Sequence, residues 1–393
     1  MLYLNNLGLL CALGSGTADV RSALLTRDTP VPDPLASMQT IEGHLLASVK
    51  EPLPQLSGAL TRFSCRNNAL AAAALEQIRP ALDTAIERYG SSRIAVVMGT
   101  STSGIVESEK AVKSVLDKGK YPQGYHAIQG VLGGLGEFVS AYLNTSGPVT
   151  TVSTACSSSA NAILSARRLL DLDLCDAVVV GGVDSLCALT LQGFGSLEAL
   201  AGQYCTPFAL DRDGINIGEA AAIFLMSRTP GAVRFLGGAA SSDAHHISAP
   251  HPEGEGAYTA MNEALINAGL HYDEIDYLNV HGTATKQNDA MESKAIHRLF
   301  GANTPCSSTK SMTGHTLGAS GALELALCWL LLTQGGNWRL PPSLYTTERD
   351  PGLAQISLTG TNDYATEAPS HCMSNSFAFG GSNVSLIIGA NHG

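Results

Sequence analysis

Short, continuously apolar stretches alternate with longer helical segments along most of the chain. Residues 94–100 read Ile-Ala-Val-Val-Met-Gly-Thr, and residues 176–184 form a second run of this kind. Strands that are apolar on both faces are typical of sheets covered by helices on both sides. Their alternation with helices of roughly ten or more residues predicts a layered α/β fold.

The same succession of elements occurs twice. The paired segments are 2–13 and 233–240, 94–100 and 275–283, 149–152 and 305–308, and 176–184 and 374–390. We interpret the glycine pairs at 181–182 and 237–238 as turns at the ends of their strands. A duplicated succession predicts two similar halves. Stacked on each other, they would form a five-layer α-β-α-β-α sandwich.

A turn signal, Thr229-Pro230-Gly231, separates the two repeats. We therefore expect an N-terminal half of residues 1–230 and a C-terminal half of residues 231–393. Residues 101–129 have no counterpart in the second half, so we expect an insertion there that serves as a pocket wall or a dimer element.

Composition narrows the possible functions. The 393 residues are 45% hydrophobic and only 15% charged, which favours a large core and a tight dimer. A net charge of −11 argues against nucleic acids and anionic membranes as partners. Nine cysteines without a Cys-x-x-Cys pair indicate a reducing compartment, and we expect the cytoplasm. Residues 317–332 are apolar but interrupted by Glu324, so we expect a buried helix and no membrane insertion.

Cys156 lies between a strand and the start of a helix. Unpaired amides and the helix dipole favour negative charge there, which predicts a lowered thiol pKa and a nucleophilic sulfur. The alternative for a lone cysteine is a small buried hydrophobic residue.

Two histidines favour the nucleophilic interpretation of Cys156 over the structural one. His281 ends a strand at the carboxyl edge of a sheet, where α/β folds form ligand crevices. His315 lies near the start of an apolar helix, at a position equivalent by the repeat to that of Cys156. Each histidine alone could be structural. Because the repeat places all three residues at matching edges, we expect one pocket to collect them.

Four motifs in this order resemble the elongating Cys-His-His β-ketoacyl synthases of the thiolase-like superfamily. They are Thr-Ala-Cys-Ser-Ser at 154–158, His-Gly-Thr-Ala-Thr at 281–285, Lys-Ser-Met-Thr-Gly-His at 310–315 and Asn-Ser-Phe-Ala-Phe-Gly-Gly-Ser-Asn at 375–383. The resemblance covers nearly the whole chain and implies a thiolase-like fold. It implies a decarboxylating condensation between an acyl group and malonyl-acyl carrier protein.

The resemblance also implies individual roles. Cys156 would carry the acyl group, while His281 and His315 would hold the malonyl thioester carbonyl. The amides of Cys156 and Phe379 would form an oxyanion hole, with Phe379 also acting as a gate. Further implied residues are Lys310 as a fixed charge near His315, Glu324 as its counter-ion, Phe377 as a substrate contact, and Thr283 and Thr285 as contacts of the phosphopantetheine arm. A structural ion pair remains the alternative for Lys310 and Glu324, and turn formation for the threonines.

The implied partners are an acyl carrier protein and a second subunit, either an identical chain or a chain-length-factor-like homologue. No metal is expected, and no cofactor besides the phosphopantetheine arm of the carrier. An acidic carrier needs a basic patch. Arg62 and Arg66, spaced i, i+4 at the start of an alanine-rich helix, are candidates, with solvated surface charge as the alternative.

Three positions depart from the family pattern: Lys286 stands where Pro is frequent, Asn288 where Gly is usual, and Ala378 where Gly lies between the two phenylalanines. The last substitution puts gating in doubt. Residues 99–104 and 288–292 are similar to synthases of aryl-polyene pigment clusters, although fatty acid and polyketide pathways stay open.

Other members of the fold remain rivals. A thiolase would need a second reactive cysteine near the carboxyl end, where this chain has the segment 377–383. A starter-type synthase would use Cys-His-Asn. A non-catalytic chain-length partner would have lost the cysteine that is present here at Cys156.

Overall fold

The computed structural model describes residues 1–25, 38–41, 43–336, 339–344 and 348–391. Within them, one continuous 12-stranded sheet runs in the order β12-β11-β10-β13-β14-β9-β1-β8-β7-β5-β6, with β2 beside β1. The strands of the first half are β1 (Leu2–Cys11), β2 (Gly14–Ser15), β5 (Ile94–Gly99), β6 (Val149–Val152), β7 (Ala177–Asp184) and β8 (Ala220–Ser227). Those of the second half are β9 (Val233–Ser242), β10 (Tyr277–Asn279), β11 (Pro305–Ser307), β12 (Ser357–Leu358), β13 (His371–Phe377) and β14 (Ser382–Ala390). A separate hairpin joins β3 (Met38–Ile41) to β4 (His44–Ala47).

The strand order displays the duplication. Outward from the central β9-β1 pair, β8, β7, β5 and β6 on one side match β14, β13, β10 and β11 on the other. Each side has the same pattern, with antiparallel pairs next to the centre and parallel pairs beyond them. The two halves are therefore built on one plan.

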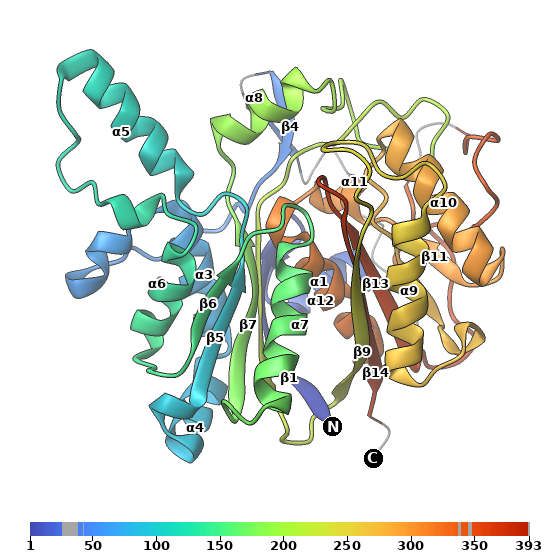
Figure 1. Cartoon of the computed structure of the whole chain (residues 1–393), viewed down its shortest axis with the longest axis horizontal. Coiled ribbons are helices and arrows are strands. Elements are labelled where there is room, and N and C mark those ends of the chain that lie inside the picture. The colour runs from blue at the N-terminus through green and yellow to red at the C-terminus, as the bar shows by residue number, and fades with distance from the viewer. Residues whose placement is uncertain (26–37, 42, 337–338, 345–347, 392–393) are drawn as a thin grey trace.

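The layers follow from where the helices pack. The helices α1 (Thr17–Leu25), α7 (Ser158–Asp171) and α12 (Ser320–Leu332) lie between the two halves of the sheet (Figure 1). One apolar core joins them to both halves. A second core packs α3 (Arg66–Gln77), α4 (Arg79–Tyr89) and α6 (Gly134–Leu143) on the first half, and a third packs α9 (Glu255–Ala268) and α10 (Lys286–Phe300) on the second. This is the predicted five-layer α/β sandwich, and α12 is the predicted buried helix.

The glycine pairs expected at turns lie inside strands. Gly181 belongs to β7 and Gly237 to β9. A methyl group on Gly181 would lie 2.0 Å from the Ala222 carbonyl oxygen of β8, and one on Gly237 would lie 2.6 Å from the Ala268 amide nitrogen at the end of α9. Close backbone approach, rather than chain reversal, explains these glycines, so the turn interpretation was wrong. As a consequence, 176–184 matches β13 and not the whole of 374–390.

Residues 101–129 contain α5 (Ile105–Lys118) and the short 3₁₀ turn η3 (Ala127–Gln129). In Figure 1, α5 projects from the body of the protein at the upper left. Its side chains Val112 and Leu116 are 58% and 80% exposed.

The remaining helical segments are α8 (Ala188–Ser196), α11 (Lys310–Thr313), η1 (Gly58–Phe63), η2 (Ser91–Arg93), η4 (Tyr272–Glu274) and η5 (Leu317–Ala319). None of the helices in the described part of the chain combines the length and apolar composition needed to cross a bilayer.

Candidate active site

Cys156 lies on a tight connection between β6 and α7. Ala155 before it has a φ of +50°, a left-handed conformation that costs a residue with a β-carbon roughly 1–2 kcal/mol. The Ala155 carbonyl accepts hydrogen bonds from the hydroxyls of Ser101, at 3.1 Å, and Ser158, at 2.6 Å. These bonds hold the strained turn, and the turn directs the sulfur into a cavity instead of the core.

His315 contacts the sulfur directly. Its Nε2 lies 3.0 Å from the Cys156 Sγ. Its Nδ1 faces the amide N–H of Leu317, at 3.3 Å. Because an amide can only donate, Nδ1 is the acceptor, and the network assigns the proton to Nε2. His315 therefore presents an N–H donor to the sulfur and the cavity.

Lys310 holds His281 in the same tautomer as His315. The Lys310 ammonium donates to the His281 carbonyl oxygen at 2.6 Å and faces its Nδ1 at 3.5 Å. An ammonium has no acceptor, so Nδ1 is unprotonated and Nε2 carries the proton. The imidazoles of His281 and His315 are 5.3 Å apart between centroids, at 84°. Two neutral N–H donors thus converge beside one sulfur.

Burial sets the protonation states of these groups. It lowers the pKa of His281 and of His315 well below the ordinary value, and the charge of Lys310 lowers both further. Burial also raises the pKa of Cys156 to about 12, against the opposing effects of Lys310 and of the Phe379 amide. The expectation of a lowered thiol pKa was wrong for the resting protein, because desolvation outweighs the helix terminus.

Lys310 and Glu324 form a buried ion pair, as expected. The side chain of Lys310 is 0% exposed and that of Glu324 2% exposed. Burial raises the pKa of Glu324 to about 7, although Lys310 lowers it. The Lys310 charge also lies near His315, as expected, since it lowers the pKa of that imidazole. The hydrogen bonds that Lys310 makes within the histidine pair are to His281.

The Phe379 loop covers the sulfur. The amides of Phe379 and Cys156 both donate toward the thiol and lower its pKa. The Phe379 ring packs against Phe194 of α8, with centroids 5.7 Å apart. Positive φ angles fall on Gly380 and Gly381, at +83° and +78°. Ala378 is not in that region, so its methyl group causes no backbone strain.

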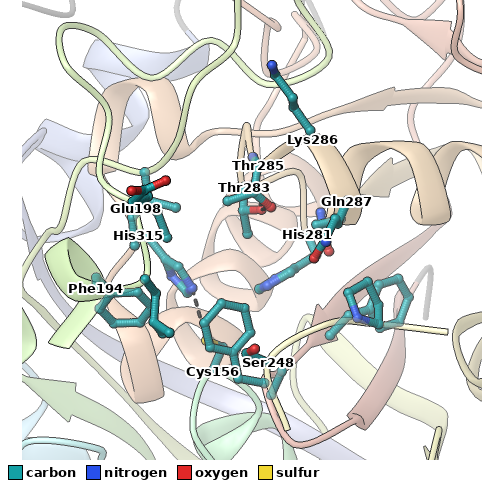
Figure 2. A pocket seen from close by; sticks show the side chains of 18 of the residues that line it. Cys156, Phe194, Glu198, Ser248, His281, Thr283, Thr285, Lys286, Gln287 and His315 are labelled. Atoms are coloured by element: carbon teal, nitrogen blue, oxygen red, sulfur yellow. Dashed lines mark hydrogen bonds between the residues drawn. The ribbon is translucent and has the colours of Figure 1, made fainter. Parts of the chain in front are cut away.

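A cavity of about 530 Å³ leads to these groups. That volume is within the usual range for small-molecule sites. Figure 2 shows Cys156 and the two histidines at its inner end, with Thr283, Thr285 and Lys286 on one wall. The Thr283 and Thr285 hydroxyls are 2.9 Å apart. Other lining residues are Phe194, Leu197, Glu198, Ala199, Asp213, Ile215, Ser248, Pro250, Gln287, Asn288, Phe377, Ala378, Phe379 and Asn383.

Known families match nearly the whole chain. The N-terminal domain of β-ketoacyl synthases matches residues 21–232, and their C-terminal domain matches residues 233–345. The chain belongs to the β-ketoacyl synthase family. It is similar to nodulation protein E of Rhizobium leguminosarum, with 32% identity over 98% of each chain, and to 3-oxoacyl-[acyl-carrier-protein] synthase 2 of Coxiella burnetii, with 29% identity over 98% of each.

Solved structures agree with the family. A chain of the complex between the ketosynthase ApeO and its chain length factor ApeC from Xenorhabdus doucetiae superposes with a TM-score of 0.90, at 44% identity and with 99% and 98% of the two chains covered. A β-ketoacyl synthase from Burkholderia phymatum superposes with a TM-score of 0.86, at 27% identity and with 100% and 99% covered. The thiolase-like fold and the condensing-enzyme class of this synthase are thus shown.

Sequence reasoning missed a buried acidic pair beneath His281. Glu292 accepts hydrogen bonds from the amides of His281 and Gly282, each at 2.7 Å, and burial raises its pKa to about 7. Asp289 accepts from the Phe208 amide at 2.7 Å, and burial raises its pKa to about 6. Both face the histidine loop from one side of α10. Their i, i+3 spacing directly after the His-Gly-Thr motif was a signal that could have found them.

Asp184 was missed as well. This fully buried carboxylate ends β7 and accepts from the Thr100 hydroxyl at 2.6 Å and the Thr102 amide at 2.8 Å. It also accepts from the amide of Ser101, whose hydroxyl holds the Ala155 carbonyl. Asp184 thereby supports the turn that carries Cys156.

The proposed docking arginines do not share a helix face. Arg62 lies in η1, whereas Arg66 begins α3. The Arg66 guanidinium forms an ion pair with the buried Glu219, with Nε 2.8 Å from Oε2, and donates to the Val49 carbonyl at 3.1 Å. The prediction of one projecting face was wrong, because the chain bends between the two residues and an internal carboxylate binds Arg66.

Cys156, His281 and His315 also place three metal-ligating atoms within 4.8 Å of one another. Two imidazoles and a thiolate are ligands that suit zinc. The expectation of a metal-free site stays a prediction. All nine cysteines are free and buried, and Cys372, the only one near the carboxyl end, lies in β13 within the core.

Proposed function

We propose that this synthase joins an acyl group on Cys156 to a malonyl unit held by an acyl carrier protein, releasing CO₂ and a 3-oxoacyl thioester. The observation that carries the proposal is the convergence of two Nε2–H donors and two backbone amides on one cavity around the Cys156 sulfur. Anionic oxygens that form during a condensation need donors in that arrangement.

The first step would load Cys156. Its sulfur attacks the carbonyl carbon of an acyl thioester, the bond to the carrier's sulfur breaks, and the thiol proton goes to that leaving sulfur. The amides of Cys156 and Phe379 face the carbonyl oxygen during this attack. Because burial disfavours a free thiolate, the sulfur gains its negative charge only as it reacts, beside the N–H donor of His315.

The second step would use the histidines. Their Nε2–H groups bind the malonyl thioester oxygen, so that the electrons of the breaking carboxyl bond move into an enolate as CO₂ leaves. The enolate carbon attacks the acyl group on Cys156, and the Cys156 sulfur departs and takes a proton from solvent. Lys310 keeps His281 in the required tautomer, and Glu292 holds the His281 backbone in position. Thr283 and Thr285 would contact the phosphopantetheine arm, and Phe377 the substrate.

The partners are part of the proposal. Structures of similar synthases are described as complexes with a chain length factor and with an acyl-carrier protein. We propose that this chain binds an acyl carrier protein and works in the cytoplasm as a dimer, identical or paired with a chain-length-factor-like homologue. Exposed apolar side chains on α5 support a subunit contact at the inserted segment. The aryl-polyene pathway and the absence of a cofactor stay predictions.

Acylation and decarboxylation can be tested separately. Incubation with an acyl-carrier thioester is expected to add one acyl group to the wild type, detected by intact-protein mass, and none to Cys156→Ala. His281→Ala and His315→Ala are expected to lower CO₂ release from malonyl-carrier protein by about 100- to 1000-fold, because each removes one donor. Both variants should still become acylated.

Two results would contradict the proposal. An unmodified wild-type protein would favour the non-catalytic chain-length partner, and normal CO₂ release from both histidine variants would remove their assigned role. Acetyl transfer to free coenzyme A without CO₂ release would favour a thiolase. His297→Ala is a matched control, because that histidine lies on α10 and bonds the Gln355 carbonyl outside the cavity.

A further inference from the structure

Lys286 is a charged side chain on the cavity wall that the proposed chemistry does not use. It is the first residue of α10 and is exposed. Within the described part of the chain, no hydrogen bond or ion pair engages its ammonium group. A cation without an internal partner at a cavity wall is available to a ligand.

The charges around the cavity make Lys286 distinctive. Among the described residues that line it, Lys286 is the only lysine or arginine, whereas Glu198 and Asp213 contribute carboxylates. An anionic group entering the cavity would be repelled by these carboxylates and attracted by one ammonium. Among the described lining residues, Lys286 is therefore the one that can attract an anionic group at the outer part of the cavity.

The side chains of the wall that leads to Lys286 become more exposed from His281 through Thr283 and Thr285 to Lys286. His281 is 1% exposed and Thr283 6% exposed, while Thr285 is half-buried and Lys286 is exposed. Figure 2 shows these side chains one after another from the reacting sulfur outward, with the Lys286 ammonium farthest from Cys156. The order along this wall is thus imidazole, hydroxyl, hydroxyl, cation.

We propose that Lys286 binds the phosphate of the phosphopantetheine arm and so positions the malonyl thioester at the histidines. The proposal rests on the proposed function, which supplies a ligand with a thioester at one end, amides in the middle and a phosphate at the other end. The thioester meets the imidazoles, the amides lie beside the hydroxyls of Thr283 and Thr285, and the anionic phosphate meets the ammonium.

The carrier protein is the alternative source of negative charge, since an acidic protein surface would also attract an exposed lysine. Small thioesters distinguish the two sources. Malonyl-phosphopantetheine keeps the phosphate without the protein, and malonyl-pantetheine lacks both. The test measures CO₂ release by the wild type and by Lys286→Gln with each small substrate and with malonyl-carrier protein, at low ionic strength.

The expected result is a loss of about five-fold in kcat/KM for malonyl-phosphopantetheine, the size of a partly exposed charge pair, carried mainly by KM. Malonyl-pantetheine should be used equally well by the variant and the wild type. Lys294→Gln is the matched control, because Lys294 lies on the same helix, pairs with Glu253 and does not line the cavity. Lys294→Gln should leave kcat/KM unchanged for all three substrates.

Three results would overturn the proposal. They are an unchanged kcat/KM for malonyl-phosphopantetheine, an equal loss for both small thioesters, and a loss confined to the intact carrier, which would place Lys286 against the carrier surface. A wild-type protein that decarboxylates none of the three substrates would contradict the proposed function itself, so the two failures can be told apart.

Discussion

The effect of the buried Lys310–Glu324 ion pair on stability can be measured separately from its effect on catalysis. Lys310→Met keeps the length of the side chain and removes its charge. Glu324 is buried, and its Oε2 has no hydrogen-bond partner in the described structure. Removing one member of a buried pair costs about 3–5 kcal/mol, because the other charge stays desolvated. That is a large share of the roughly 5–15 kcal/mol by which domains are stable.

A second variant removes the pair entirely. Lys310→Met combined with Glu324→Leu leaves no unpaired charge, so we expect it to recover most of the lost free energy of unfolding. It does not restore the ammonium that faces the Nδ1 of His281. Without that donor the tautomer of His281 is no longer assigned, and its Nε2–H is lost from part of the molecules. We expect CO₂ release to stay about 100-fold below that of the wild type.

The assays are urea unfolding at pH 8, which is above the Glu324 pKa of about 7 in the wild type, and CO₂ release from malonyl-carrier protein, with Cys156 acylation as the control for an intact fold. A double variant that decarboxylates as fast as the wild type would show that the ion pair is structural only. A single variant within about 0.5 kcal/mol of the wild type in its free energy of unfolding would refute the reasoning from desolvation.

Two further predictions concern other buried carboxylates. Burial raises the pKa of Glu292 from 4.5 in the unfolded chain to about 7 in the folded protein, so the folded state binds more protons between these values. The free energy of unfolding of the wild type should therefore fall, relative to Glu292→Gln, as the pH rises from 4.5 to 7, by at most about 1.4 kcal/mol per pH unit; parallel urea-unfolding profiles would contradict the raised pKa. Arg66→Ala should lower the free energy of unfolding by about 1–3 kcal/mol, because it leaves Glu219 buried with fewer donors, whereas Arg62→Ala should change it by less than about 0.5 kcal/mol. Equal urea midpoints for the two arginine variants would show that the Glu219 pair adds no stability.

Much of the fold was predictable because it depends on local signals. Continuous apolar runs and the turn at 229–231 mark the strands and the two halves. The strand order then repeats as the duplication requires. The glycine pairs were misinterpreted, because a glycine that reverses the chain and a glycine that admits a neighbouring backbone look the same in sequence. The Ala222 carbonyl that excludes a side chain from Gly181 lies on a different strand.

The candidate site divides in the same way. The sequence by itself determined which side chains can react, since Cys156, His281, His315 and Lys310 each lie in a recognisable motif. Only the tertiary structure decided the distances between these side chains and their protonation states. Cys156 and His315 are 159 residues apart in the chain, yet their side-chain atoms lie at 3.0 Å. Burial by the whole fold, and not the local helix terminus, sets the thiol pKa, and a carboxylate 153 residues away binds Arg66. The repeat predicted that Cys156 and the two histidines share a pocket. The contact distances, the Arg66 ion pair and the desolvation depend on packing between distant segments, which the linear pattern does not record.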